Sequence, residues 1–302
     1  MIVRALLAAW LAAVTCVLAT GAWAEPSTTV DAPAGSAATR GLLYEIRPPT
    51  GAPPSYLFGT IHSEDVRVKL PAPVREAFDA SPSIALEMVP DASAIIRAMV
   101  TMSYTDGRLL RDVLPADLYL ETADALAQVG MPEEAFKDLK PWSVVTLLSS
   151  PPSETGEFLD ILLFHRAVAD GKRVEGLETM TEQLAVFDDL SEADQITLLR
   201  ETLASREQLP LVFEALIAAY IERDVDQLQH LSEQHLAESD PRLAAHFQEV
   251  VIDSRNRRMV ERMVPLLAEG GWFIAIGALH LPGDQGVVAL LRRRDHGVRV
   301  VF

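Results

Sequence analysis

The sequence predicts an α+β fold, a single domain in which a central mixed β-sheet pairs N- and C-terminal strands and a largely helical middle packs around it. Two apolar runs, Tyr56–Ile61 and Trp272–Ile276, lie near opposite ends of the 302-residue chain, and each carries or meets a glycine. Such runs are typical of buried strands. Between them, apolar residues mostly recur every three or four positions, as in helices. If both runs enter one sheet, the chain forms one domain rather than two.

Residues 1–24 have the composition of a secretory signal peptide. Arg4 precedes an apolar stretch from Ala5 to about Leu18, and Ala22-Trp23-Ala24 forms an A-x-A cleavage site. The stretch is short for a membrane span, and an uncleaved anchor is the alternative. Residues 25–40, rich in Pro, Ala, Ser, Thr and Gly, predict a disordered lead-in to a domain over residues 41–302. We therefore expect an exported protein, periplasmic or secreted, with no membrane span after cleavage.

The N-terminal part of the domain is predicted to supply strands. A proline-rich turn over residues 48–54 separates two strand-like segments, which should pair as an antiparallel hairpin. A short helix and a third strand follow. The expected segments are strand Leu42–Ile46, strand Tyr56–Ile61, helix Pro71–Ala80 and strand Ser83–Met88.

The middle is predicted to be helical, with interruptions near Gly107, at Gly130-Met131-Pro132 and at Lys140-Pro141-Trp142, the last being a packed helix start. Thr179 followed by Glu182 fits a capping box that opens a helix. The further expected segments are helix Phe158–Ala169, strand Lys172–Glu178, helices from Ser191 to about Glu222, helix Asp224–His235, a long helix from Pro241 to about Leu267, helix Gly286–Arg294 and strand Val298–Phe302.

Composition narrows the classes of partner and of ligand. The formal net charge of −17 argues against nucleic acid or an anionic membrane surface as a partner. Cys16 is the only cysteine, and it lies in the predicted signal peptide. A metal in the mature protein would therefore be held by His, Asp, Glu or water. The sequence has no G-x-S-x-G, Walker A, dinucleotide-binding glycine or H-E-x-x-H motif.

Four candidate metal ligands fall at the ends of predicted strands. His62 and His280 each stand three residues after a glycine, in Gly59-Thr60-Ile61-His62 and Gly277-Ala278-Leu279-His280. Glu87 and Glu178 end two other strands. Open α/β sheets hold ligands beyond their strand ends, and two imidazoles with two carboxylates suit Zn, Mn, Fe or Co. A carboxylate that does not bind the metal could act as a general base. Taken singly, each of these residues is more often structural.

Two further candidates lie on the long helix. Asn256 shares an apolar face with Ile252, Met259, Met263 and Leu267, and Arg255 borders that face. A buried polar pair needs partners, so Arg255 could steady a carboxylate or a developing oxyanion, or form a structural salt bridge. Two groups of polar residues are expected to face solvent: Arg257, Arg258 and Arg262, and the remaining histidines His165, His230, His235, His246 and His296.

Together these motifs resemble the TraB/GumN family, which includes the animal TIKI proteins. The matching features are Leu57–His62, Leu86-Glu87, Lys140-Pro141-Trp142, Gly176–Thr179 with Gln183, Arg255-Asn256 and Gly277–Gly283. The resemblance implies an erythromycin-esterase/ChaN-like α+β fold and, for TIKI-type members, a divalent-metal-dependent protease. It also implies that His62 and His280 are metal or catalytic residues, Glu87 and Glu178 acidic partners, and Arg255 a site residue. Arg294–Gly297 departs from the family pattern by inserting residues before the usual glycine turn.

Three functions follow from these observations. The first is an exported hydrolase that depends on a divalent metal, most simply a peptidase, with water activated between the two G-x-x-H strand ends. Its catalytic residues would be Glu87, Glu178, Arg255 and Asn256, and its partner a peptide or small-molecule substrate. The second is a non-catalytic protein of the same fold that binds haem or a peptide. The third, an accessory factor in polysaccharide export, rests on the family name alone.

Overall fold

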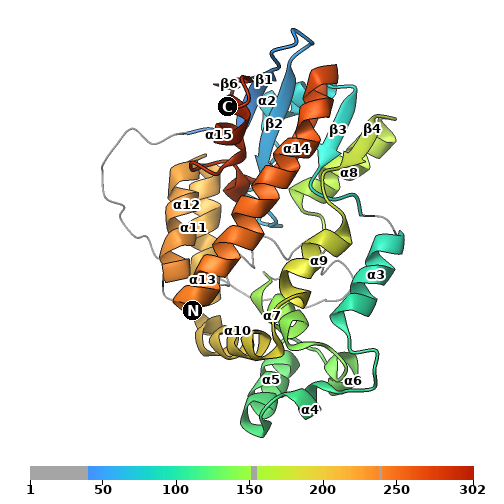
Figure 1. Ribbon diagram of the computed structural model, residues 1–302, viewed down its shortest axis with the longest axis vertical. Coiled ribbons are helices and arrows are strands. Elements are labelled where there is room, and N and C mark those ends of the chain that lie inside the picture. The colour runs from blue at the N-terminus through green and yellow to red at the C-terminus, as the bar shows by residue number, and fades with distance from the viewer. Residues whose placement is uncertain (1–39, 91, 151–154, 238–239) are drawn as a thin grey trace.

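A six-stranded mixed sheet forms one end of the molecule (Figure 1). The computed structural model describes residues 40–90, 92–150, 155–237 and 240–302. The strands are β1 (Leu43–Arg47), β2 (Ser55–Thr60), β3 (Ser83–Leu86), β4 (Arg173–Gly176), β5 (Trp272–Gly277) and β6 (Gly297–Val300). Their order across the sheet is β4-β3-β5-β2-β1-β6. The predicted pairing of N- and C-terminal strands is confirmed.

The four strands β4, β3, β5 and β2 run parallel to one another. Strand β5 lies between β2 and β3, although about 185 residues, which include the helical middle, separate it in the chain from the end of β3. Strand β1 is antiparallel to both β2 and β6. Because the parallel strands share a direction, the residues that follow β2, β3, β4 and β5 emerge at one edge of the sheet. All four predicted ligands therefore lie at that edge.

The two glycines of the G-x-x-H motifs allow close packing. Neither is required for a turn, because Gly59 lies inside β2, and Gly277 ends β5 with φ −54° and ψ 135°, which any residue can adopt. A Cβ on Gly59 would lie 2.5 Å from Cδ1 of Leu281 and 3.1 Å from Cα of Ala278. A Cβ on Gly277 would lie 3.2 Å from Oε1 of Glu87. The first motif thus packs directly on the turn of the second.

Helices cover the sheet and form the opposite end of the molecule (Figure 1). They are α2 (Ala72–Ala80), α3 (Ala92–Met102), α4 (Leu110–Val113), α5 (Ala116–Gln128), α6 (Glu133–Phe136), α7 (Pro141–Ser149), α8 (Leu159–Ala169), α9 (Met180–Asp188), α10 (Glu192–Ser205), α11 (Leu209–Ile221), α12 (Val225–Ala237), α13 (Pro241–Phe247), α14 (Ser254–Glu269) and α15 (Val287–Arg292). Short 3-10 turns are η1 (Arg206–Gln208) and η3 (Ala278–His280), and η2 (Gln248–Asp253) is a π-helix.

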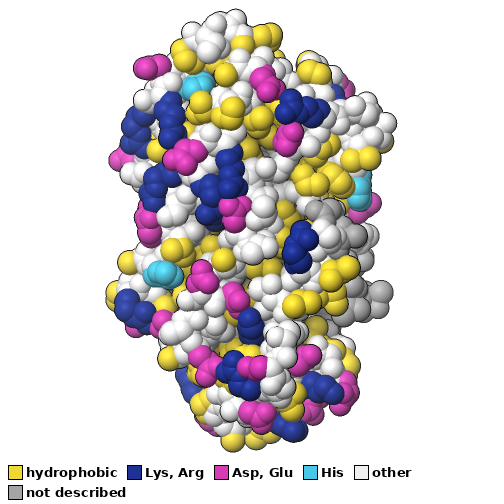
Figure 2. All heavy atoms as spheres, turned by 45° about the vertical axis from the view of Figure 1, so that its right-hand side comes forward, with side chains coloured by type: hydrophobic (Ala, Val, Ile, Leu, Met, Phe, Trp, Pro, Cys, Tyr) yellow, Lys and Arg dark blue, Asp and Glu magenta, His cyan; other side chains and the backbone are white. Residues whose placement is uncertain are grey.

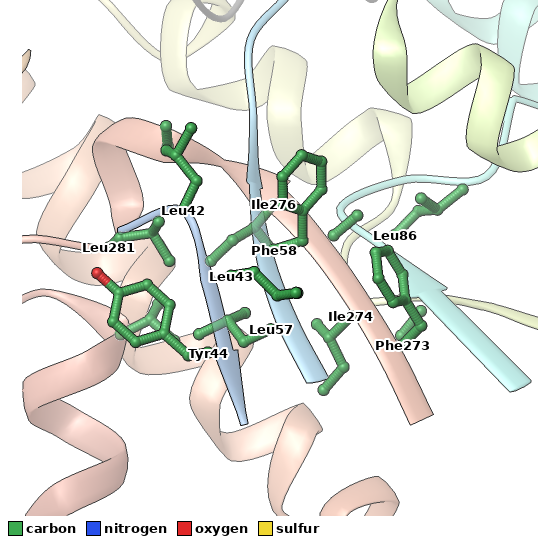
Figure 3. Close-up of a cluster of buried hydrophobic side chains, with 14 of the residues drawn as sticks. Leu42, Leu43, Tyr44, Leu57, Phe58, Leu86, Phe273, Ile274, Ile276 and Leu281 are labelled. Atoms are coloured by element: carbon green, nitrogen blue, oxygen red, sulfur yellow. The ribbon is translucent and has the colours of Figure 1, made fainter. Parts of the chain in front are cut away.

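The buried apolar side chains fall into two clusters. The first fills the sheet and the inner faces of the helices on it, and contains Phe58, Phe273, Ile274 and Leu281 (Figure 3). The second joins the helices away from the sheet, namely α3 to α7, α9, α10 and α13, around Trp142. Leu279, which is partly buried, packs against both clusters. The turn that precedes His280 therefore lies where the sheet meets the helical end.

Local signals in the sequence predicted several helix starts. The Thr179 hydroxyl accepts from the backbone N–H of Glu182, whose carboxylate accepts from the backbone N–H of Thr179, and the predicted capping box at α9 is confirmed. Ser191 caps α10. The helix expected from Pro241 to Leu267 is three consecutive segments, α13, η2 and α14, because the turn at residues 248–253 widens to a π-helix. Such widened turns are frequent at functional sites.

The predicted signal peptide and residues 25–39 of the lead-in lie outside the described residues. In the part of the chain that the structure describes, no helix is both long and apolar enough to cross a bilayer. On the face shown in Figure 2, acidic and basic side chains are interspersed with hydrophobic ones.

Candidate active site at the carboxyl edge of the sheet

His62, which follows β2 by two residues, is held against a carboxylate from α8. Its Nε2 lies 2.8 Å from Oδ2 of Asp160. The other oxygen, Oδ1, accepts a hydrogen bond of 2.7 Å from the hydroxyl of Thr60. Burial raises the pKa of Asp160, but the contacts with His62 and Thr60 outweigh it and hold this pKa below its ordinary value. An ionised carboxylate only accepts protons in hydrogen bonds, so the contact favours an imidazole with its proton on Nε2.

Glu87 directly follows β3, and each of its oxygens accepts a hydrogen bond. Oε1 accepts from the backbone N–H of Gly277 at 2.6 Å, and Oε2 accepts from Nη2 of Arg255 at 2.8 Å. Burial raises the pKa of Glu87, whereas Arg255, His280 and the Gly277 amide lower it by more, and the pKa lies below its ordinary value. Glu87 is therefore an ionised carboxylate in an almost closed environment.

The tautomer of His280, at the end of η3, follows from its neighbours. Nε2 lies 3.2 Å from Nη1 of Arg255, which can only donate, so Nε2 accepts and the proton is on Nδ1. Nδ1 then donates at 2.7 Å to Oδ1 of Asn256, whose Nδ2 donates at 2.8 Å to the carbonyl of Gln285. Burial and the nearby Arg255 lower the pKa of His280 from 6.5 to about 4. The ring is neutral near pH 7, with its lone pair on Nε2.

Arg255 and Glu178 form a buried ion pair behind these residues. Glu178 lies between β4 and α9, and its Oε2 accepts from Nε and Nη2 of Arg255 at 2.8 and 2.6 Å. Its Oε1 accepts from Nε and Nη2 of Arg258 at 3.1 and 2.5 Å. Burial lowers the pKa of Arg255, but Glu87 and Glu178 raise it by more, to above its ordinary value. Charges therefore alternate along Arg258, Glu178, Arg255 and Glu87.

Three of the four predicted ligands line one cavity of about 30 Å³: His62, Glu87 and His280. Its other walls include Gly277 and the apolar Val251. A second cavity of about 30 Å³, on the α8 side, is lined by His62, Glu87 and Asp160. Each volume suits one or two water molecules. Glu178, Arg255 and Asn256 line neither of these two cavities; they hold the residues that do.

The donor set of the first cavity fits a divalent metal in its chemistry. Two imidazoles and one carboxylate are a ligand set for Zn, Mn, Fe or Co, and three protein ligands leave a position open. Each histidine turns one ring nitrogen to an oxygen, on Asp160 or Asn256, as metal-binding histidines usually do. Glu178 does not share this arrangement, because it lines neither cavity and both its oxygens pair with arginines. Within the described residues, no three His, Cys, Asp or Glu side chains are arranged so that they could hold a metal ion, so the fit is one of chemistry and not of geometry.

The sequence analysis missed one carboxylate and misassigned two other side chains. Asp160 stands in the first turn of α8, where an acidic residue is commonplace, so no local pattern marks it. Arg258, expected to face solvent, reaches Glu178 with a side chain that is only 32% exposed. His296, also expected at the surface, is buried, and its Nδ1 lies 3.0 Å from the carbonyl of Arg294.

The model of the TraB/PrgY/gumN family matches residues 42–300. The chain belongs to this family. The match covers every strand of the sheet and all the residues of the site described above.

Curated relatives of this TraB/PrgY/gumN protein are similar to it at low identity. The "Metalloprotease TIKI1" of Danio rerio is 28% identical over 299 residues, which cover 82% of this chain and 60% of that protein. The "Metalloprotease TIKI2" of the same species is 25% identical, with 91% and 63% covered. The "Metalloprotease TIKI1" of Homo sapiens is 26% identical, with 82% and 59% covered. The chain thus spans less than two thirds of the length of these relatives. No solved structure matches it.

Proposed function

We propose that this protein is an exported hydrolase that cleaves peptide bonds with the help of a divalent metal. The observation that carries the proposal is the meeting of His62, Glu87 and His280, from the ends of three adjacent parallel strands, around one cavity of about 30 Å³. The names of the TIKI relatives, which are called metalloproteases, support the same reaction class.

In this proposal His62 and His280 would hold the metal, and Glu87 would stand beside them as the carboxylate that does not bind it. When bound, a divalent metal would polarise the scissile carbonyl and make water a stronger nucleophile. Asp160 and Asn256 fix the two imidazoles so that one nitrogen of each carries a lone pair. Glu87 is kept ionised by Arg255 and the Gly277 amide, and it is the side chain suited to move a proton from water. Glu178 orients Arg255 and takes no part in the chemistry.

The geometry gives less support to the alternative functions. A porphyrin needs an apolar pocket of several hundred Å³, whereas the cavity that both histidines line measures about 30 Å³. Arg255, Glu87 and Glu178 also form a charged network at this edge, which a non-catalytic peptide-binding protein would not need. No observation bears on polysaccharide export.

The test measures metal content and peptide cleavage on the same purified protein. After reconstitution with Mn, Co, Zn or Fe, the wild type should hold one equivalent of metal per chain. The double variant His62→Ala, His280→Ala should hold none while remaining folded. Glu87→Gln should lower kcat by about 10²-fold to 10⁴-fold, as expected for a lost proton-transferring group. Glu178→Gln should have a smaller effect, which falls mainly on stability.

The matched control is His165→Ala, which removes an exposed histidine of α8 away from the cavity. It should keep both metal and activity. A wild-type protein that binds none of the four metals would refute the metal-dependent reaction. Equal loss of kcat in Glu87→Gln and Glu178→Gln would refute the separate roles of the two carboxylates.

A further inference from the structure

A third cavity, larger than the two described above, adjoins the site and is polar. Its volume is about 270 Å³, roughly ninefold that of the cavity at His280. It lies between α12, the π-helix η2 and the loop after η3. Its walls include three carboxylates, Glu233, Asp253 and Asp284. A space of this size holds a long side chain, well beyond a single water molecule.

Within the part of the chain that the structure describes, the three carboxylates have no cationic partner. Among the described residues, none of them lies within 4.0 Å of a lysine, arginine or histidine nitrogen. Glu233 and Asp253 each accept one hydrogen bond, from the side-chain amides of Gln229 and Gln248 at 2.7 and 3.0 Å. Those amides are neutral. Arg293 reaches the backbone carbonyl of Asp284 and leaves its carboxylate unpaired. The cavity therefore has an uncompensated negative charge.

Ser232 adds an observation of a different kind. It lines this cavity from α12 and is 6% exposed, yet its hydroxyl makes no hydrogen bond within the described part of the chain. The hydroxyl is not among the fully buried polar atoms that lack a partner, so it reaches the space of the cavity. A ligand or ordered water there can complete its bonding. Ser232 and the three carboxylates thus face the same space, and all of them can accept a hydrogen bond from a donor placed there.

The lining of the cavity suits an organic cation. The three carboxylates are spread around a wide cavity, with amide and hydroxyl groups between them. A guanidinium or ammonium group, which has several donors and a long apolar stem, suits such a lining.

The polar cavity lies next to the proposed active site. Ile252 and Leu279 line both it and the cavity at His62 and His280. Gln285, on its wall, accepts from the same Asn256 that orients His280. A side chain in the polar cavity would thus be separated from the proposed active site only by the shared lining residues.

We propose that this cavity, which we call the acidic subsite, binds a lysine or arginine side chain of a peptide substrate, close to the scissile bond. The proposal rests on the hydrolase function proposed above and specifies its substrate class. Carboxylates from α12, η2 and the loop after η3 would pair with the cation, and Ser232 would accept one of its protons.

The experiment uses fluorescein-labelled pentapeptides Ala-Ala-X-Ala-Ala in which X is lysine, norleucine or glutamate. Binding to the full-length mature protein is followed by fluorescence anisotropy at low salt, and cleavage by chromatography in parallel. We expect the lysine peptide to bind about tenfold more tightly than the norleucine peptide, which has a similar stem without charge. Asp284→Asn should reduce that preference by about threefold, and the triple variant Glu233→Gln, Asp253→Asn, Asp284→Asn should abolish it.

The matched control is Glu121→Gln, which removes one exposed carboxylate from α5, away from the acidic subsite. It should leave the preference unchanged, and circular dichroism should confirm that every variant is folded. Equal binding of the lysine and norleucine peptides, no binding of either, or a preference that survives in the folded triple variant would overturn the proposal. Binding is measured without turnover. If the lysine peptide binds more tightly but no peptide is cleaved, the hydrolase proposal is refuted and the acidic subsite stands. If peptides are cleaved without a preference for lysine, the acidic subsite is refuted and the hydrolase stands.

Discussion

Arg255 donates two hydrogen bonds to a single oxygen of Glu178, from Nε at 2.8 Å and from Nη2 at 2.6 Å. The Arg255 side chain is fully buried, and the same Nη2 also reaches Glu87. We predict that Arg255→Met lowers the free energy of unfolding by about 3–5 kcal/mol, because it leaves two buried carboxylates without their common cation. Urea unfolding measures the change.

The control for this prediction is Arg257→Met, on the same helix, where the guanidinium pairs with Glu249 and is 43% exposed. Exposed pairs contribute about 0–1 kcal/mol, so this variant should differ little from the wild type. If the two variants lose the same stability, the buried network has no special role in the fold.

We predict that Asp160→Asn weakens metal binding by about 10-fold to 100-fold, as expected when the partner of a metal-binding histidine is lost. The amide keeps the volume and can still accept from Thr60, but it does not hold the proton on Nε2 of His62 as a carboxylate does. Competition with a fluorescent chelator measures the affinity. Glu157→Gln, which changes an exposed carboxylate just before α8, is the control. An unchanged affinity would mean that Asp160 does not position His62.

The lowered pKa of His280 predicts a loss of stability in mild acid. The unfolded imidazole binds a proton as the pH falls through 6.5, whereas the folded one does so only near about 4. Between these values the unfolded state holds more protons, so the free energy of unfolding decreases as the pH falls. The full contribution is about 3 kcal/mol, since one pKa unit corresponds to about 1.4 kcal/mol.

Urea unfolding of the wild type and of His280→Gln at several pH values isolates this contribution. The free energy of unfolding of the wild type, relative to that of His280→Gln, should decrease as the pH falls from 6.5 to about 4. Below that pH the difference should stay constant. His165→Gln, which changes an exposed histidine, should follow the wild type throughout. A difference that stays constant with pH would show that His280 does not titrate as inferred.

The glycines of the two G-x-x-H motifs should differ in the effect of an added methyl group. Gly59→Ala would bring Cβ to 2.5 Å from Leu281 and 3.1 Å from the backbone of Ala278, so we predict a loss of about 1–3 kcal/mol from overpacking. Gly277→Ala would bring it to 3.2 Å from a Glu87 oxygen, so activity should fall more than stability. Thermal unfolding and peptide cleavage separate the two. The opposite ranking would contradict these assignments.

The strands, and with them the four strand-end residues, could be predicted from the sequence because their signals are local. Apolar runs such as Trp272–Ile276 and terminal glycines identify buried strands, and a carboxylate or histidine just beyond them falls at the edge of a sheet. Once β2, β3 and β5 are parallel neighbours, His62, Glu87 and His280 must converge.

The roles within the site could not be predicted, because they depend on helix packing across the sheet edge. Whether Glu87 or Glu178 faces the cavity is decided by α14, which places Arg255 between them and Arg258 beyond Glu178. No periodicity distinguishes Arg258 from its exposed neighbour Arg257. Asp160 lies about 100 residues from His62 in the chain, and only the docking of α8 on the sheet brings them together.

The position of β5 between β2 and β3 also constrains how the molecule forms. During synthesis, Trp272 is made after nine tenths of the chain, on the order of 270 residues. Until then β2 and β3 have no common neighbour, and His62 and Glu87 have nothing to bring them together. Closing contacts over so long a separation is entropically slow. A nascent or truncated chain that ends before Trp272 lacks the strand that brings His62, Glu87 and His280 together, so the candidate site can form only after β5 has been made.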